Sequence, residues 1–301
     1  MSPVSLSPSR LANYATCPRL YDHRYVRDVN APDRTELYLN QGTIYHETIE
    51  DVCEATARDD PPEEIHDRAM RIFDAKWEEH STADDYESAA HQEYQRAENR
   101  AAIESFFAPD GGVGIDHARR SIATECWVEC EVDGRGLHGK ADNVIRTDDG
   151  LHIFDYKRKT HGMLSDRTAE YLGDHLDGEA HEPKRVRNAF QTATYIEGVK
   201  NEPFYEDGME VRFSFYGLLN KTSFESTPTG YDVAARGWSR ETTEIYDDHY
   251  DTIWALIRAA HDGITGETFD PEPFDLINEE ACPDCDYREM CADRLSTEVR
   301  R

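Results

Sequence analysis

Long hydrophobic runs are missing from this 301-residue sequence. No stretch of about 18 consecutive apolar residues occurs, which excludes an obvious membrane-spanning helix. The first residues, MSPVSLSPSRL, lack the charged and apolar regions of a signal peptide. We therefore expect a cytoplasmic protein that has no membrane partner.

Basic side chains are also scarce. The chain has 33 Lys and Arg against 62 Asp and Glu, a formal net charge of −29, and only seven of the basic residues are lysine. Hydrophobic residues still make up 38% of the chain, which is enough for a packed core and argues against a disordered acidic tail. This balance is typical of a halophilic protein from a high-salt cytoplasm. One interpretation is that such a protein avoids polyanions. The other is that it binds nucleic acid, because salt already weakens counterion-release binding and net charge does not decide the matter.

The segment 139–159 is expected to form two strands joined by an Asp-Asp-Gly turn at 148–150. Depending on which two residues form the loop, Asp142 lies opposite Lys157 or opposite Asp155. In both registers two carboxylates and one ammonium share a face that begins with apolar residues. Such a face is costly to bury unless the charges are compensated, and Mg²⁺ or Mn²⁺ held by the carboxylates would do so. The alternative is an exposed hairpin with an ordinary salt bridge.

Cysteine is infrequent, but three of the seven residues form a Cys-x2-Cys-x5-Cys motif near the C-terminus, at Cys282, Cys285 and Cys291. In a cytoplasmic protein this spacing indicates metal ligation rather than disulfides. Cys17 is the best candidate for a fourth ligand, since the other cysteines lie on predicted apolar faces. Those are Cys53, Cys126 and Cys130. We favour a [4Fe–4S] cluster that ties the chain ends together, with zinc or no metal as the alternatives.

The rest of the chain predicts helices and strands that surround the hairpin. Helices are expected at 36–57, 60–108, 185–200 and 248–262, and strands at 121–133, 209–219 and 231–246. The segment 134–141 nearly matches a phosphate-binding loop, but Ala141 lacks a hydroxyl group and a strand follows it. His46, Gln191 and Tyr195 lie beside the apolar stripes of their helices, where polar residues are more often structural than functional.

Six motifs, taken in chain order, resemble those of RecB-type nucleases of the PD-(D/E)XK superfamily that carry an iron–sulfur cluster. The greatest similarity is to the CRISPR-associated exonucleases of the fourth Cas family. The matching elements are Cys17, Gly42-x3-His46, Gly139-x2-Asp142, Asp155-Tyr156-Lys157, Gln191-x3-Tyr195 and the C-terminal cysteine triplet.

The resemblance implies an α/β fold with a restriction-endonuclease-like core, in which helices flank a central mixed sheet. It implies a single RecB-like nuclease domain over residues 1–301 with a helical insert at 60–108. An iron–sulfur module would consist of residue 17 together with 282–291.

The resemblance also implies roles for individual residues. The implied ligands of Mg²⁺ or Mn²⁺ are His46, Asp142, Asp155 and the backbone carbonyl of Tyr156. Lys157 would activate or orient the attacking water, while Gln191 and Tyr195 would position DNA or the lysine. The implied ligands of a structural [4Fe–4S] cluster are Cys17, Cys282, Cys285 and Cys291.

The implied function is that of a metal-dependent deoxyribonuclease, a single-strand or end-directed exonuclease in CRISPR adaptation or DNA repair. Its partners would be DNA with single strands or free ends and the proteins of those pathways. Two alternatives are an inactive iron–sulfur scaffold subunit that binds DNA and a repair or defence nuclease unrelated to CRISPR. The chain departs from the family in its length and in carrying Asp155 where many relatives carry Glu.

Overall fold

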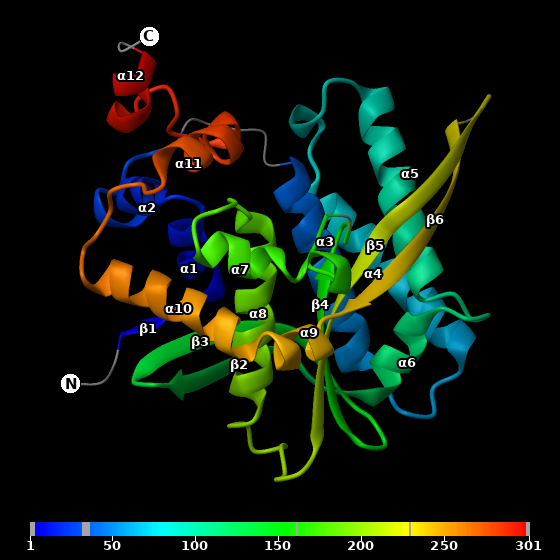
Figure 1. Ribbon diagram of the computed structural model, residues 1–301. Coiled ribbons are helices and arrows are strands. Elements are labelled where there is room, and N and C mark those ends of the chain that lie inside the picture. Colours follow the sequence, from blue (N-terminus) through cyan, green and yellow to red (C-terminus); the bar gives the residue numbers. More distant parts are fainter. Residues whose placement is uncertain (1–3, 32–36, 161, 229, 299–301) are drawn as a thin grey trace.

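The computed structural model describes residues 4–31, 37–160, 162–228 and 230–298. In these residues, helices pack on both faces of a six-stranded mixed sheet of order β1-β3-β4-β5-β6, with β2 also paired to β3 (Figure 1). The strands are β1 (Ser5–Leu6), β2 (Ser121–Val132), β3 (Arg135–Arg146), β4 (Gly150–Lys157), β5 (Glu210–Thr227) and β6 (Gly230–Glu241). The expected α/β architecture is confirmed.

The helices of the described residues include those that the sequence predicts at 36–57, 60–108, 185–200 and 248–262. They are α1 (Pro8–Thr16), α2 (Pro18–Tyr21), α3 (Leu37–Ala55), α4 (Pro62–His80), α5 (Ala89–Phe106), α6 (Val113–Arg120), α7 (Tyr171–Leu176), α8 (Pro183–Val199), α9 (Thr243–Asp248), α10 (Tyr250–Thr265), α11 (Phe274–Glu280) and α12 (Ala292–Glu298). Ser7 caps α1 by accepting the Arg10 N–H, and the extended backbone at Cys17 separates α1 from α2. In the described part of the chain, no helix combines the length and apolarity that crossing a bilayer requires.

The strand expected at 231–246 is wrong over its last residues, because β6 ends at Glu241 and α9 begins at Thr243. The Thr243 hydroxyl accepts the Phe213 N–H, which ends the strand pairing there. β5 in turn runs to Thr227, well past the expected end at residue 219. The two strands therefore form a long arm that extends beyond the sheet beside α5 (Figure 1).

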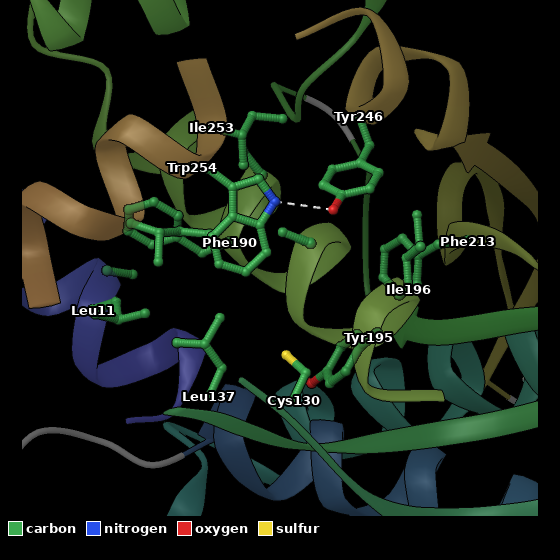
Figure 2. Packing of buried hydrophobic residues seen from close by; sticks show 14 of the residues in the cluster. Leu11, Cys130, Leu137, Phe190, Tyr195, Ile196, Phe213, Tyr246, Ile253 and Trp254 are labelled. Atoms are coloured by element: carbon green, nitrogen blue, oxygen red, sulfur yellow. Dashed lines mark hydrogen bonds between the residues drawn. The ribbon is translucent and has the colours of Figure 1, made fainter. Parts of the chain in front are cut away.

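Each face of the sheet has its own apolar core. On one face, α1, α8 and α10 cover the sheet; Figure 2 shows Phe190 and Trp254 close to Leu137, with the Trp254 indole N–H donating to Tyr246 Oη at 3.0 Å. On the other face, α3 to α6 enclose a second core, which includes Tyr156 and Phe106. The three cysteines expected to pack do so: Cys53 and Cys130 are buried, and Cys126 is partly buried against the first core.

The β3–β4 hairpin adopts the second of the two registers considered. Its loop is Asp148–Asp149, and its ladder runs from Arg146–Leu151 to Asn143–Phe154. Continuing this register by one residue places Asp142 opposite Asp155. The backbone ladder stops at that point, so the two strands separate where the two acids face each other.

Candidate active site

Asp155 lies at the centre of the site, near the end of β4. Its side chain is only 2% exposed, and Oδ1 lies 2.5 Å from Lys157 Nζ. Its other oxygen, Oδ2, accepts a hydrogen bond from Gln191 Nε2 at 3.1 Å. Alternation along β4 places Asp155 and Lys157 on the face covered by α8, and α8 supplies Gln191. The structure thus brings three of the predicted residues together.

His46 and Asp142 form the second half of the site. α3 carries His46 to β3, where Nδ1 lies 3.3 Å from Asp142 Oδ2. The same oxygen accepts the backbone N–H of Tyr156 at 2.6 Å. Tyr156 therefore orients Asp142 through its backbone, while its ring packs in the second core. The role of its carbonyl as a metal ligand stays a prediction.

Glu125 is a site residue that the sequence pattern missed. Strict alternation along β2 would put Glu125 on the same face as Trp127 and Glu129, opposite the face of the cysteines. The structure instead gives Glu125 a left-handed backbone, φ 46°, and its carboxylate pairs with Lys140 and lies 3.9 Å from His46 Nδ1. Left-handed backbone at a non-glycine residue is uncommon and concentrates at functional sites. No feature of the alternation pattern signals it.

Burial and close charges change the proton affinities of the site. Burial raises the pKa of Asp155 to about 6, against the effect of Lys157. Burial disfavours the charged form of His46, but the Asp142 carboxylate outweighs it and raises the His46 pKa to about 9. Burial likewise opposes ionisation of Asp142, yet His46 and Lys157 hold its pKa below the usual range. The Lys157 pKa is raised by Asp155 and Asp142 despite burial.

The donor set fits a hard divalent cation. Ligand atoms of His46, Glu125 and Asp142 all lie within 4.8 Å of one another. One imidazole nitrogen and two carboxylates suit Mg²⁺ or Mn²⁺. Asp155 is not part of this compact group, since its two oxygens face Lys157 and Gln191.

A sequence profile of the PD-(D/E)XK nuclease superfamily matches residues 5–292. The chain belongs to this superfamily. A search of the curated proteins finds no match to it. Membership implies a phosphodiester hydrolase that uses a divalent metal and acts on nucleic acid, which agrees with the donor set at the splayed ends of β3 and β4.

Tyr195 of this PD-(D/E)XK protein lies beneath the site rather than at its surface. The side chain is 6% exposed and packs against Gly139, where an added Cβ would lie 2.6 Å from the ring. Gly139 is therefore needed for close packing of α8 on β3. The ring therefore supports the packing of α8 on β3. A role of Tyr195 in positioning DNA or Lys157 stays a prediction.

The four cysteines of the predicted cluster line one cavity of about 260 Å³ between the α1–α2 junction and the C-terminal segment. In the described residues, however, no three of their sulfurs lie within 4.8 Å of one another. Thiolates on one tetrahedral zinc, at 2.3 Å from the metal, would be about 3.8 Å apart. The structure therefore shows a shared cavity and no compact cysteine cluster.

Proposed function

We propose that this PD-(D/E)XK protein is a metal-dependent deoxyribonuclease that acts on single-stranded DNA or free ends. The observation that carries the proposal is the convergence of His46, Asp142, Asp155 and Lys157 where β3 and β4 separate. A bound Mg²⁺ or Mn²⁺ would lower the pKa of a water molecule and screen the phosphodiester.

Each side chain of the site would have a separate role. His46 and Asp142 would hold the metal, and Glu125 would add a third side-chain ligand that the resemblance did not include. Asp155 fixes Lys157 in place through their contact, and the ammonium would orient the attacking water and stabilise charge on the phosphate. Gln191 holds the opposite oxygen of Asp155 and so fixes its rotamer.

Loss of the central charges tests the proposal. Asp142→Ala, Asp155→Ala and Lys157→Ala are each expected to abolish Mn²⁺-dependent cleavage of end-labelled DNA in high salt, while circular dichroism shows a folded protein. Cleavage retained in all three purified variants would contradict the nuclease assignment. DNA binding by the unsubstituted protein without any cleavage would favour the inactive scaffold.

We further propose that the whole chain is one RecB-like domain with an insert at 60–108, acting in CRISPR adaptation or DNA repair. Six motifs in family order support this placement. The insert packs its helices against the second core, away from the face that carries Asp155. Neighbouring genes would distinguish CRISPR adaptation from repair or defence.

A structural [4Fe–4S] cluster bound by Cys17, Cys282, Cys285 and Cys291 is also part of the proposal. Its support is the Cys-x2-Cys-x5-Cys spacing and the one cavity that all four residues line. The charged residues that line this cavity are of both signs: Arg19, Lys184, Arg24, Arg187 and Arg288 with Glu280, Asp284 and Asp286. Iron and sulfide analysis of anaerobically purified protein tests this part: about four irons per chain are expected, and zinc alone would contradict it.

A further inference from the structure

A basic and aromatic cleft lies beside the candidate active site of this acidic protein. It has a volume of about 350 Å³ and no carboxylate in its lining. The lining residues are Thr160, Asn220, Lys221, Arg236, Gly237, Trp238 and Arg240. In a chain of net charge −29, three cations without an acid in one cleft are a marked local reversal of charge.

Strand register connects this cleft to the site. Lys157 of β4 is paired with Gly217 of β5, and Gly217 is paired with Trp238 of β6. Two residues earlier on β4, Asp155 is paired with Phe215 of β5, and Phe215 is paired with Arg240 of β6. Residues paired across strands point to the same face, so the cleft continues the catalytic face of the sheet. At about 4.8 Å per strand, the Trp238 and Lys157 backbones are roughly 10 Å apart.

Gly217 leaves room for a hydrogen-bonded pair of residues between Lys157 and Trp238. Asn220 lies over it, accepting the Thr160 N–H at 2.8 Å and donating to Thr160 Oγ1 at 2.7 Å. A Cβ on Gly217 would approach both Thr160 N and Asn220 Oδ1 to 2.8 Å. An irregularity in the β5–β6 pairing between Gly217 and Lys221 produces this arrangement, as bulges near active sites commonly do.

The cations of the cleft have no side-chain partner in the part of the chain that the structure describes. Among the described residues, the side chains of Lys221, Arg236 and Arg240 take part in no ion pair or hydrogen bond, and Arg240 Nε is buried without an acceptor. Lys221 and Arg236 even face each other across the strands, where like charges repel. Trp238, between the two arginines on β6, is 56% exposed. An unpaired cation row beside an exposed indole suits a polyanion with aromatic bases.

We propose that this cleft binds the single-stranded DNA that enters the active site, with a base stacked on Trp238 and phosphates held by Arg236 and Arg240. The inference rests on the proposed nuclease function. A single strand is favoured over a duplex because only an unpaired base offers its face to an indole. The 10 Å separation corresponds to about three stacked nucleotides at 3.4 Å each.

The experiment measures binding of the full chain to a fluorescein-labelled oligothymidylate by anisotropy, in EDTA so that cleavage cannot occur. Trp238→Ala should weaken binding about fivefold to a hundredfold. Arg236→Gln and Arg240→Gln should each reduce the salt slope of the affinity by about 0.7. The matched control is Phe224→Ala, on the opposite face of the same arm and similarly exposed at 58%, which should bind like the unsubstituted protein.

Four outcomes are informative. Selective loss in the three cleft variants, together with weaker binding of a blunt duplex by the unsubstituted protein, supports the proposal. Equal affinity for the duplex overturns the single-strand assignment. Unchanged binding by Trp238→Ala, in a protein that still cleaves DNA with Mn²⁺, overturns the cleft and leaves the nuclease standing. A protein that neither binds nor cleaves DNA overturns both.

Discussion

At the scale of the residue, the site depends on one carboxylate that breaks the alternation of its strand. Glu125 turns toward His46 through a left-handed backbone, at a cost of about 1–3 kcal/mol for such a conformation. Lys140 neutralises it in the absence of metal. A backbone distortion that places an acid beside a histidine and a second acid indicates a ligand.

Glu125→Gln is expected to weaken Mn²⁺ binding by about tenfold or more, since it removes one of three charged or basic donors. Titration calorimetry or the electron paramagnetic resonance of free Mn²⁺ measures this without reference to activity. Glu129→Gln, on the exposed face of the same strand, is the control. Equal Mn²⁺ affinity in the two variants would remove Glu125 from the ligand set.

Metal binding should depend on pH through His46. Its pKa is raised to about 9 without metal, so the imidazole is protonated at pH 7.5 and must lose its proton to become a ligand. We expect release of about one proton per Mn²⁺ at this pH and an affinity that rises as pH approaches 9. Without metal, the stability of the fold changes with pH in the opposite direction. The ion pair between His46 and Asp142 stabilises the fold fully below pH 6.5, and this stabilisation is lost as the pH rises through about 9.

Calorimetry in two buffers of different ionisation enthalpy measures the proton release. His46→Ala should bind Mn²⁺ weakly and release no proton from this position. Mn²⁺ binding by the unsubstituted protein without proton release at pH 7.5 would show that the imidazole is not a ligand.

At the scale of the element, the β3–β4–β5 strands and α8 determine what the site residues can reach. α8 packs so closely on β3 that Gly139 and Tyr195 touch, and this contact brings Gln191 over Asp155. On the other side, β5 leaves Gly217 between Lys157 and the cleft. Both positions lack a side chain because a neighbouring element occupies the space.

Gly217→Ala tests the second of these contacts. The added methyl group would force the Thr160–Asn220 pair away, and such overpacking costs about 1–3 kcal/mol of unfolding free energy. Urea denaturation should show this loss, and cleavage should slow because residue 160 follows the catalytic segment. Gly173→Ala, in α7 with open space around it, should be neutral or stabilising. A stable and fully active Gly217→Ala protein would argue against a rigid floor between Lys157 and Trp238.

At the scale of the whole molecule, residues 19–29 lie against residues 286–293. Arg19 contacts Asp293, Arg24 contacts Asp286, and Tyr287 Oη donates to the Val29 carbonyl. The cysteine cavity lies among these contacts. Ion pairs of this kind contribute little individually, so we expect a bound cluster to supply much of the stability of this junction.

Cys285→Ala should therefore lose iron and the visible absorbance of the cluster, and its thermal midpoint should fall by several degrees. Cys126→Ala removes a cysteine outside the cavity and should keep the iron. Unchanged iron content and absorbance in Cys285→Ala would exclude this residue as a ligand. Absence of iron from the unsubstituted protein would leave the nuclease proposal intact and remove the cluster.

Much of the fold and the centre of the site follow from local patterns. Alternation along the strand at 150–157 determines that Asp155 and Lys157 share a buried face, and the helical spacing of Gln191 and Tyr195 places both on the side of α8 that meets the sheet. These are properties of a single element, set by its own periodicity. The mixed α/β architecture was implied by the family resemblance. The fine boundary at 241–243 could not be predicted from either source.

Only the tertiary structure decided which elements meet. The register of the hairpin and the approach of His46 to Asp142 depend on pairing and packing between different segments of the chain. The same holds for the cross-strand pairing that joins Lys157 to Trp238 through Gly217. The approach of Glu125 to His46 depends on a left-handed backbone at Glu125, which the periodicity of the sequence does not predict. Sequence periodicity determines the face on which a side chain lies, whereas the packing of whole elements determines what stands opposite that face.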